Sequence, residues 1–248
     1  MVEHELAPWV QWHGRLMVVA WVILLPLGVL IARFFKVTPH QQWPATLDNK
    51  FWWHCHRALQ YAGIVTMTAA AGLAIAHADI ARSPMPIHGL LGFAVLGLGW
   101  LQLVSGWLRG TKGGPQGGPG GSATAVVRGD HYDMTRHRLV FEYTHKLGGY
   151  AVLLLATVDV ALGLRVAHAL AWITGLIGAT WLGGAALFAW LQWKGLCLDT
   201  YQAIWGPGLE HPGNRIPPVG WGIRRVSESP PAAGAGSVAT PHAKGNAE

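Results

Sequence analysis

The sequence predicts an all-α membrane protein with five transmembrane helices, and three observations support this prediction. Hydrophobic residues occupy 51% of the 248 positions and charged residues only 12%, about half the share typical of soluble domains. The chain contains 14 Trp and 33 Gly, which are enriched at membrane interfaces and at close helix contacts. Five apolar segments are each long enough to cross a bilayer core of roughly 30 Å.

These five segments define the expected organisation of the chain. They cover residues 12–35, 52–77, 87–108, 139–166 and 170–193. Residues 1–9 are expected to form a short outer segment, 10–195 the membrane domain, and 196–248 a largely disordered Pro/Gly-rich tail. The connector 110–137 begins with the run TKGGPQGGPGGS, which is not expected to pack a core.

Lys and Arg are distributed unevenly between the two ends of the predicted helices. Only Arg15, Arg82 and Arg165 fall on the side of the N-terminus, and the other 15 of the 18 basic residues fall on the opposite side. The positive-inside rule therefore predicts an external N-terminus and a cytoplasmic C-terminus, in the inner membrane if the cell is bacterial. This topology accounts for the net charge of +6, so no nucleic-acid partner is expected.

Four of the 13 histidines lie at or near the entrances of predicted helices. His13 and His88 begin the first and third segments from the external side, so they share one depth. His56 and His145 lie near the starts of the second and fourth segments, which begin on the cytoplasmic side. A b haem needs two axial imidazoles on facing helices, and this alternation provides two such pairs. Coordinating groups inside membrane helices are costly and usually mark function.

Two other histidines compete for these roles. His54 is the nearest rival of His56, but two residues along a helix face roughly opposite directions, so only one of them can be a ligand. His77 ends the second segment on the external side and is an alternative ligand there. The only cysteines are Cys55 and Cys197 and no CxxCH motif occurs, so any haem is expected to be non-covalent.

A few charged residues near these positions are further candidates. Arg33, Lys36 and Arg57 belong to a basic group around the cytoplasmic histidine pair, where they are candidates for binding an anionic or quinol donor. The general positive-inside bias is the simpler interpretation. Asp159 lies 14 residues beyond the histidine of the fourth segment, roughly 21 Å along a helix, near the depth of the external pair. It is a candidate for tuning that site, or for an ion pair with Arg165.

Four stretches of the sequence resemble the cytochrome b561 domain family. They read HGRLMVVAWVILLPLGVLIARFFK, FWWHCHRALQYAG, HGLLGFAVLGLGWLQLVSGWLRG and HRLVFEYTHKLGGYAVLLLATVDVALGL, in this order over about residues 10–195. The similarity is to the ferric-reductase-like and DOMON-linked branch, here without a DOMON domain. It implies two non-covalent b haems with His13, His56, His88 and His145 as the iron ligands. The family's HR-x-x-Q arrangement favours the second histidine of the HCHR run.

The resemblance also implies an activity. A chain of this kind would be a transmembrane oxidoreductase or electron carrier that moves electrons from a cytoplasmic quinol or ascorbate-like donor to external ferric iron or a redox protein. In the family, the basic residue ending the first helix belongs to the donor site, which corresponds to Arg33 or Lys36. A second hypothesis is a haem-bearing anchor subunit without its own substrate site, and a third is a scaffold without haem. The expected partners are the bilayer, a small reductant, an external redox protein and a second copy of the chain.

Overall fold

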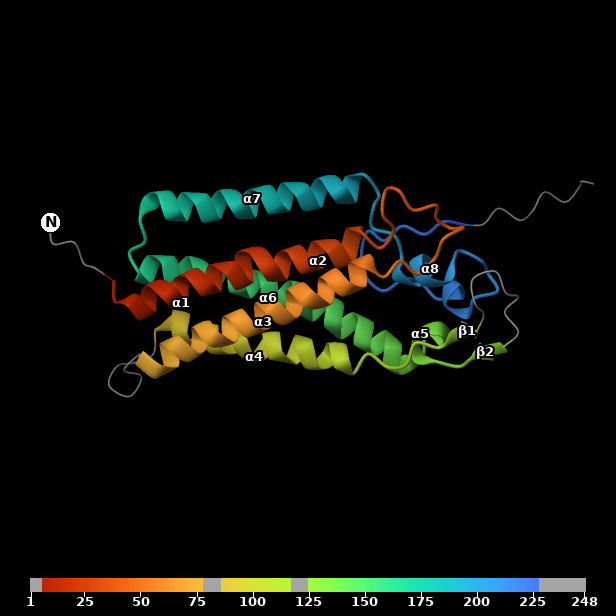
Figure 1. Cartoon of the computed structure of the whole chain (residues 1–248), viewed down its shortest axis with the longest axis horizontal. Coiled ribbons are helices and arrows are strands. Elements are labelled where there is room, and N and C mark those ends of the chain that lie inside the picture. Colours follow the sequence, from red (N-terminus) through yellow and green to blue (C-terminus); the bar gives the residue numbers. More distant parts are fainter. Residues whose placement is uncertain (1–5, 78–85, 117–124, 228–248) are drawn as a thin grey trace, which may run out of the picture.

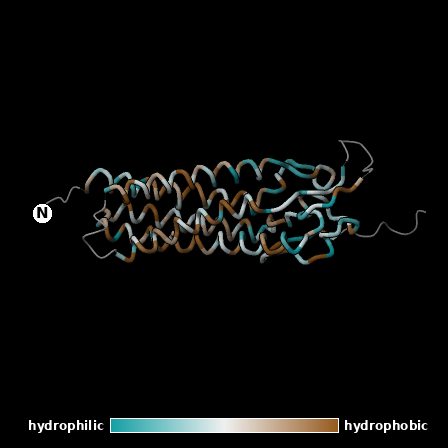
Figure 2. The backbone as a smooth tube through the Cα atoms, turned by 90° about the horizontal axis from the view of Figure 1, so that it is seen from below, coloured by the Kyte–Doolittle hydropathy of each residue, from teal (hydrophilic) through white to brown (hydrophobic). Residues whose placement is uncertain are grey.

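The computed structural model describes residues 6–77, 86–116 and 125–227, and it confirms the all-α five-helix fold (Figure 1). The helices long and apolar enough to span a membrane are Pro8–Phe34, Phe51–His77, Ile87–Trp107, Arg136–Val166 and Ala171–Trp193. Only 6% to 28% of the residues in their apolar stretches are buried within the protein, so most apolar side chains face outward. Figure 2 shows hydrophobic colours along the helices and hydrophilic colours gathered mainly at one end. The chain is therefore an integral membrane protein.

Four of the five spans form a closed bundle. The first span consists of α1 (Pro8–Val18), a π-helical turn (Val19–Leu24) and α2 (Leu25–Phe34), and the others are α3, α4, α6 and α7 in chain order. α3 packs against α1, α2 and α4, whereas α6 packs against α4, α1 and the π-helical turn. α7 lies outside this bundle along α2 (Figure 1). The apolar core between the four spans includes Trp21 and Met67.

The π-helical turn stands directly before Pro26 and has a local cause. Proline has no N–H to donate, and its ring collides with the carbonyl group four residues earlier, so a regular α-helical ladder cannot continue through this point. The wider π turn absorbs this defect. Just beyond it, Gly28 is buried where α2 meets α3, and a Cβ atom there would lie 2.3 Å from Nε2 of Gln60. A larger residue at this position would therefore have to displace the Gln60 side chain.

Residues 196–227 form a folded cap, which lies at the end of the bundle opposite the N-terminal segment (Figure 1). The cap contains α8 (Thr200–Trp205) and a short 3-10 turn (Pro212–Arg215). The Tyr201 hydroxyl donates to the backbone oxygen of Tyr132 at 2.7 Å and accepts from the backbone N–H of Gly213 at 3.0 Å. These contacts tie the cap both to itself and to the connector before α6.

The disorder expected of the Pro/Gly-rich tail applies mainly beyond Arg225, and residues 196–227 are folded. The apolar side chains of the YQAIW run are buried. Arg225 donates to the Asp199 carboxylate at 2.6 Å. The same carboxylate accepts a hydrogen bond from the backbone N–H of Tyr201 in the first turn of α8. The high Pro and Gly content of the whole tail makes this short aromatic helix difficult to predict from composition. Residues 228–248 lie outside the described part of the chain.

The Gly/Pro-rich connector also contributes to packing, contrary to expectation. β1 (Gly114–Gln116) pairs with the antiparallel β2 (Ala125–Val127), and α5 (Asp130–Asp133) follows. Gly114 has a φ of +107°, and a Cβ atom there would come within 2.3 Å of the Trp205 ring, so only glycine allows this contact. Tyr132, Met134, Tyr201, Ile204 and Trp205 form the buried cluster beneath. Residues 117–124 of the connector lie outside the described structure.

His131 in α5 makes this region sensitive to acid. Burial, reinforced by the positive charge of Arg138, lowers the pKa of His131 from 6.5 to about 3. The folded protein therefore holds a neutral imidazole against the cap, whereas the unfolded chain takes up a proton at this residue below pH 6.5. Stability is full above pH 6.5 and is expected to fall toward pH 3 by up to about 1.4 kcal/mol per pH unit.

A His131→Phe variant is expected to lose part of this acid sensitivity. Acid unfolding of the cap, followed by tryptophan fluorescence in detergent, measures the effect. The exposed His40→Gln serves as the control and is expected to leave the acid profile unchanged. An identical acid profile for His131→Phe and the wild type would contradict the assignment to this imidazole.

Candidate functional site

A pair of histidines lies at the end of the bundle opposite the cap. The rings of His13 from α1 and His88 from α4 have centroids 6.2 Å apart and an interplanar angle of 78°. Metal–imidazole bonds are about 2 Å long, so two rings that share one metal ion have centroids roughly 6 Å apart. The separation therefore matches two imidazoles that could bind one metal ion between them.

Both rings of this pair are held through Nδ1. His13 Nδ1 lies 2.9 Å from the backbone oxygen of Ala70, and His88 Nδ1 lies 2.9 Å from Oδ1 of Asp159 and 3.2 Å from its backbone oxygen. Because these oxygens accept hydrogen bonds, Nδ1 carries the proton and Nε2 keeps its lone pair. This is the tautomer that a metal ligand needs, with its second nitrogen anchored by the protein.

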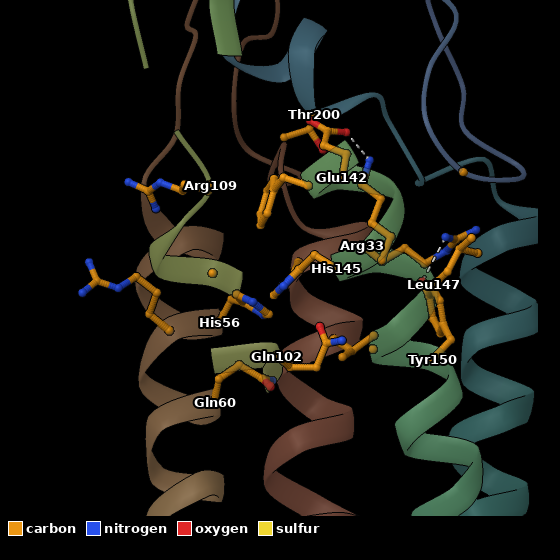
Figure 3. Close-up of a pocket in the computed structure, with 18 of the residues that line it drawn as sticks. Arg33, His56, Gln60, Gln102, Arg109, Glu142, His145, Leu147, Tyr150 and Thr200 are labelled. Atoms are coloured by element: carbon orange, nitrogen blue, oxygen red, sulfur yellow. Dashed lines mark hydrogen bonds and ion pairs between the residues drawn. The ribbon is translucent and has the colours of Figure 1, made fainter. Parts of the chain in front are cut away.

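A second pair lies toward the cap, and Figure 3 shows His56 and His145 pointing toward one another. His56 Nδ1 is 3.0 Å from the backbone oxygen of Gly28, and His145 Nδ1 is 2.8 Å from Oγ of Ser105. The Ser105 hydroxyl donates its own proton to the backbone oxygen of Gln102 at 2.8 Å, so its lone pairs can accept from His145. All four paired histidines are thus anchored through Nδ1.

A cavity of about 540 Å³ surrounds the second pair. Its walls include Trp21, Leu25, Trp52, Trp53, Gln60, Tyr61, Ile64, Leu103, Trp107, Phe141 and Val152. Figure 3 shows Gln60 and Gln102 on one side of the two rings and Glu142 on the other. Oε1 of Gln102 is buried without a hydrogen-bond partner. The combination of apolar walls, two imidazoles and a few convergent polar groups is typical of a cofactor pocket.

Two of the expected basic residues are buried beneath the cap. Arg33 donates to the Tyr150 hydroxyl at 3.1 Å and to the backbone oxygen of Trp221 at 2.9 Å. Lys36 donates to the backbone oxygens of Arg33 and Leu198, each at 3.0 Å, and burial lowers its pKa from 10.5 to about 8. Both line the cavity, but their head groups are held by neutral oxygens rather than exposed to the aqueous phase.

Arg57, the third expected basic residue, remains exposed at the edge of the cavity. Its guanidinium lies over the rings of Trp53 and Tyr61, each at 5.5 Å. The Trp107 indole donates to the Tyr61 hydroxyl at 3.0 Å, which fixes the aromatic group between α3 and α4. Of the three, Arg57 is therefore the one that a molecule approaching from outside could contact.

A buried ion-pair network beside the second pair was not foreseen from the sequence. Glu142 accepts from Arg138 at 2.9 Å and from Lys146 at 2.6 Å, and Lys146 also donates to the backbone oxygen of Val219 in the cap. The spacing of four residues on each side of Glu142 was the available signal. Glu142 lies three residues before His145 in α6, and the network joins the bundle to the cap.

The rival histidines do not join either pair. His54 is exposed, and the His77 ring stacks on Trp9 with Nδ1 bonded to the backbone oxygen of Leu73 in its own helix.

Glycine at position 163 fits the first pair closely, since a Cβ atom there would lie 2.9 Å from the His88 ring. Within the described ranges, no cluster of three or more His, Cys, Asp or Glu side chains is placed to hold a metal ion.

The chain is similar to proteins named as cytochrome b561 domain-containing proteins and ferric-chelate reductases. It is 28% identical over 163 residues to a cytochrome b561, DM13 and DOMON domain-containing protein of Arabidopsis thaliana, which covers 66% of this chain and 15% of that protein. It is 27% identical to a putative ferric-chelate reductase 1 of Xenopus laevis over 62% of this chain and 22% of that protein. Human ferric-chelate reductase 1 is 28% identical over 61% of this chain and 22% of the human protein. No family profile and no solved structure matches the chain.

Proposed function

We propose that this chain, a homologue of cytochrome b561 domain proteins and ferric-chelate reductases, carries electrons across a membrane through two non-covalent b haems. The observation that carries the proposal is that two pairs of histidines lie near opposite ends of one four-helix bundle, and that the two rings of each pair face one another. His13 and His88 would hold one haem, and His56 and His145 the other. Each ligand is anchored through Nδ1, which leaves Nε2 free for iron.

The residues around both pairs fit haem better than a small metal site. Each pair consists of two facing imidazoles with no third metal ligand among the described residues, which would suit a macrocycle held from both sides. The cavity beside His56 and His145 has aromatic walls and a basic rim. Haem held by these histidines would supply one-electron redox chemistry. The protein holds the rings, excludes water with Trp21 and Phe141, and places basic side chains such as Arg138 at the rim.

The cap end would face the cytoplasm, as the distribution of Lys and Arg indicates. A quinol or ascorbate-like donor would deliver electrons beside the cap-end pair, and ferric iron or a redox protein would accept them at the other face. Because the cap covers Arg33 and Lys36, the donor would approach at the exposed Arg57 between α3 and α4. Trp53 and Tyr61 would then present aromatic surface to the donor ring.

A second candidate is a haem-bearing membrane subunit that serves a partner and has no substrate site of its own. The specific support is the cap, which covers Arg33 and Lys36, two of the residues expected to bind a donor. In a name such as cytochrome b561, DM13 and DOMON domain-containing protein, the cytochrome is one of several domains. A partner would then supply the donor or acceptor site.

Purified protein in sealed vesicles separates the two candidates. With ascorbate or a quinol inside and ferric citrate outside, the wild type is expected to reduce the external iron at least tenfold faster than vesicles with His56→Ala, because the electron path needs both pairs. Ferrous iron trapped by a coloured chelator gives the rate. Haem-loaded wild type with no rate above empty vesicles would favour the subunit hypothesis, and protein without haem would contradict both.

A further inference from the structure

We propose that the His13/His88 pair is the low-potential site of the two and that Asp159 sets this difference. The inference rests on the proposed function, since it assumes a haem at each pair. It goes further by assigning the order of the two potentials and a residue that fixes it. The argument compares the hydrogen-bond acceptors behind the four imidazoles and the charges around each pair.

Asp159 directs its carboxylate at His88. Oδ1 of Asp159 lies 2.9 Å from Nδ1 of His88, and Asp159 is 9% exposed. The backbone of α4 passes close to the carboxylate at Gly92, where a Cβ atom would lie 3.3 Å from Oδ2. Among the described residues, its only ion-pair partner is His88. The negative charge of Asp159 therefore acts mainly on this imidazole.

The cap-end pair has neutral acceptors and positive surroundings. His56 is anchored by the backbone oxygen of Gly28 and His145 by the Ser105 hydroxyl, neither of which carries a net charge. The basic residues among those lining the cavity are Arg33, Lys36, Arg57, Arg109, Arg138 and Lys146. Glu142 is the acidic residue among the same lining residues.

These differences act on the potentials in the same direction. A carboxylate acceptor makes an imidazole a stronger electron donor, which stabilises the oxidised, more positive iron and lowers the potential at His13/His88. Positive charges near the cap-end pair favour the reduced state there and raise its potential. The cap-end site would therefore be the one that stays reduced more readily. The His13/His88 site would be the stronger reductant, which suits the reduction of a ferric acceptor.

Redox titration of Asp159→Asn tests the role of the carboxylate. Asparagine keeps an acceptor oxygen for His88 but removes the charge, so the midpoint of the His13/His88 component is expected to move to a more positive potential. A tenfold change in its oxidised-to-reduced equilibrium corresponds to about 59 mV for a one-electron couple. Ser105→Ala is the matched control, which removes a neutral acceptor from the other pair and is expected to leave the His13/His88 component unchanged.

Titration of single-site variants tests the order of potentials independently of Asp159. The haem that remains in His145→Ala is expected to have a lower midpoint than the one that remains in His88→Ala. The reverse order, equal midpoints, or an unshifted Asp159→Asn protein with both haems would overturn the inference. If Asp159→Asn loses a haem, the order in the two histidine variants decides. Two haems with the wrong order would refute this inference alone, whereas absence of haem would refute the proposed function.

Discussion

Replacing His145 by alanine is expected to halve the haem content, from two b haems per chain to one. In the proposed scheme its Nε2 would be one of two nitrogens that hold the cap-end haem, and among the described residues lining that cavity the only histidines are His56 and His145. His13→Ala is expected to remove the other haem. Reduced-minus-oxidised visible spectra with haem quantitation on purified protein measure both losses, and His54→Ala should keep two haems because its side chain is exposed.

The two variants must affect different haems for the paired scheme to stand. Equal spectra from His13→Ala and His145→Ala, with the same haem remaining, would mean that these residues share one site. Two haems retained in His145→Ala would mean that this ring is not a ligand. Loss of one haem in His54→Ala would indicate that His54, rather than His56, is the ligand.

Replacing Glu142 by glutamine is expected to destabilise the cap end by about 3–5 kcal/mol, the usual cost of removing one partner from a buried ion pair. Glu142 is 5% exposed, and its loss of charge leaves Arg138 and Lys146 without a carboxylate inside the bundle. Lys146 also holds the cap through Val219, so the cap should loosen in the same variant. Thermal unfolding in detergent measures the loss.

Glu210→Gln provides the surface comparison for this measurement. The Glu210 side chain is 71% exposed, so its replacement is expected to change stability by less than about 0.5 kcal/mol. A Glu142→Gln protein as stable as Glu210→Gln would show that the network carries no net stability. Replacing Arg138 and Glu142 together by methionine and leucine should cost less than the single change, because no charge is then left unpaired between them.

The sequence alone determined the five spans because the required signal is local. A helix in a bilayer satisfies its own backbone, so an apolar run of sufficient length is enough to identify it. The ends of the predicted segments agree with the structure within one residue, except that the first span starts at Pro8 rather than residue 12 and the fourth at Arg136 rather than residue 139. The alternation of helix direction likewise follows from chain order, which is why His13 and His88 could be placed at one depth.

The sequence failed where composition concealed structure or where distant segments meet. The Gly/Pro-rich connector and the tail resemble disordered segments, yet Gly114 accommodates Trp205 and Tyr201 binds both Tyr132 and Gly213. No local pattern reports the contacts of Gly114 with Trp205 and of Tyr201 with Tyr132, because they join residues about 70 to 90 positions apart. The same limit applied to Arg33 and Lys36, whose charges marked a donor patch in the sequence but lie under the cap in the structure.

Hydrophobicity and helix direction are properties of the chain read in order, so the sequence predicted the class of the protein and the histidines that share a depth. The group that accepts a hydrogen bond from each imidazole became apparent only from the packing of the helices. The acceptors of His13, His56 and His88 come from Ala70, Gly28 and Asp159, each on a different helix from the ring that it holds. Those acceptors fix tautomer and electron density through hydrogen bonds of about 3 Å, and the packing of helices is what brings such groups together.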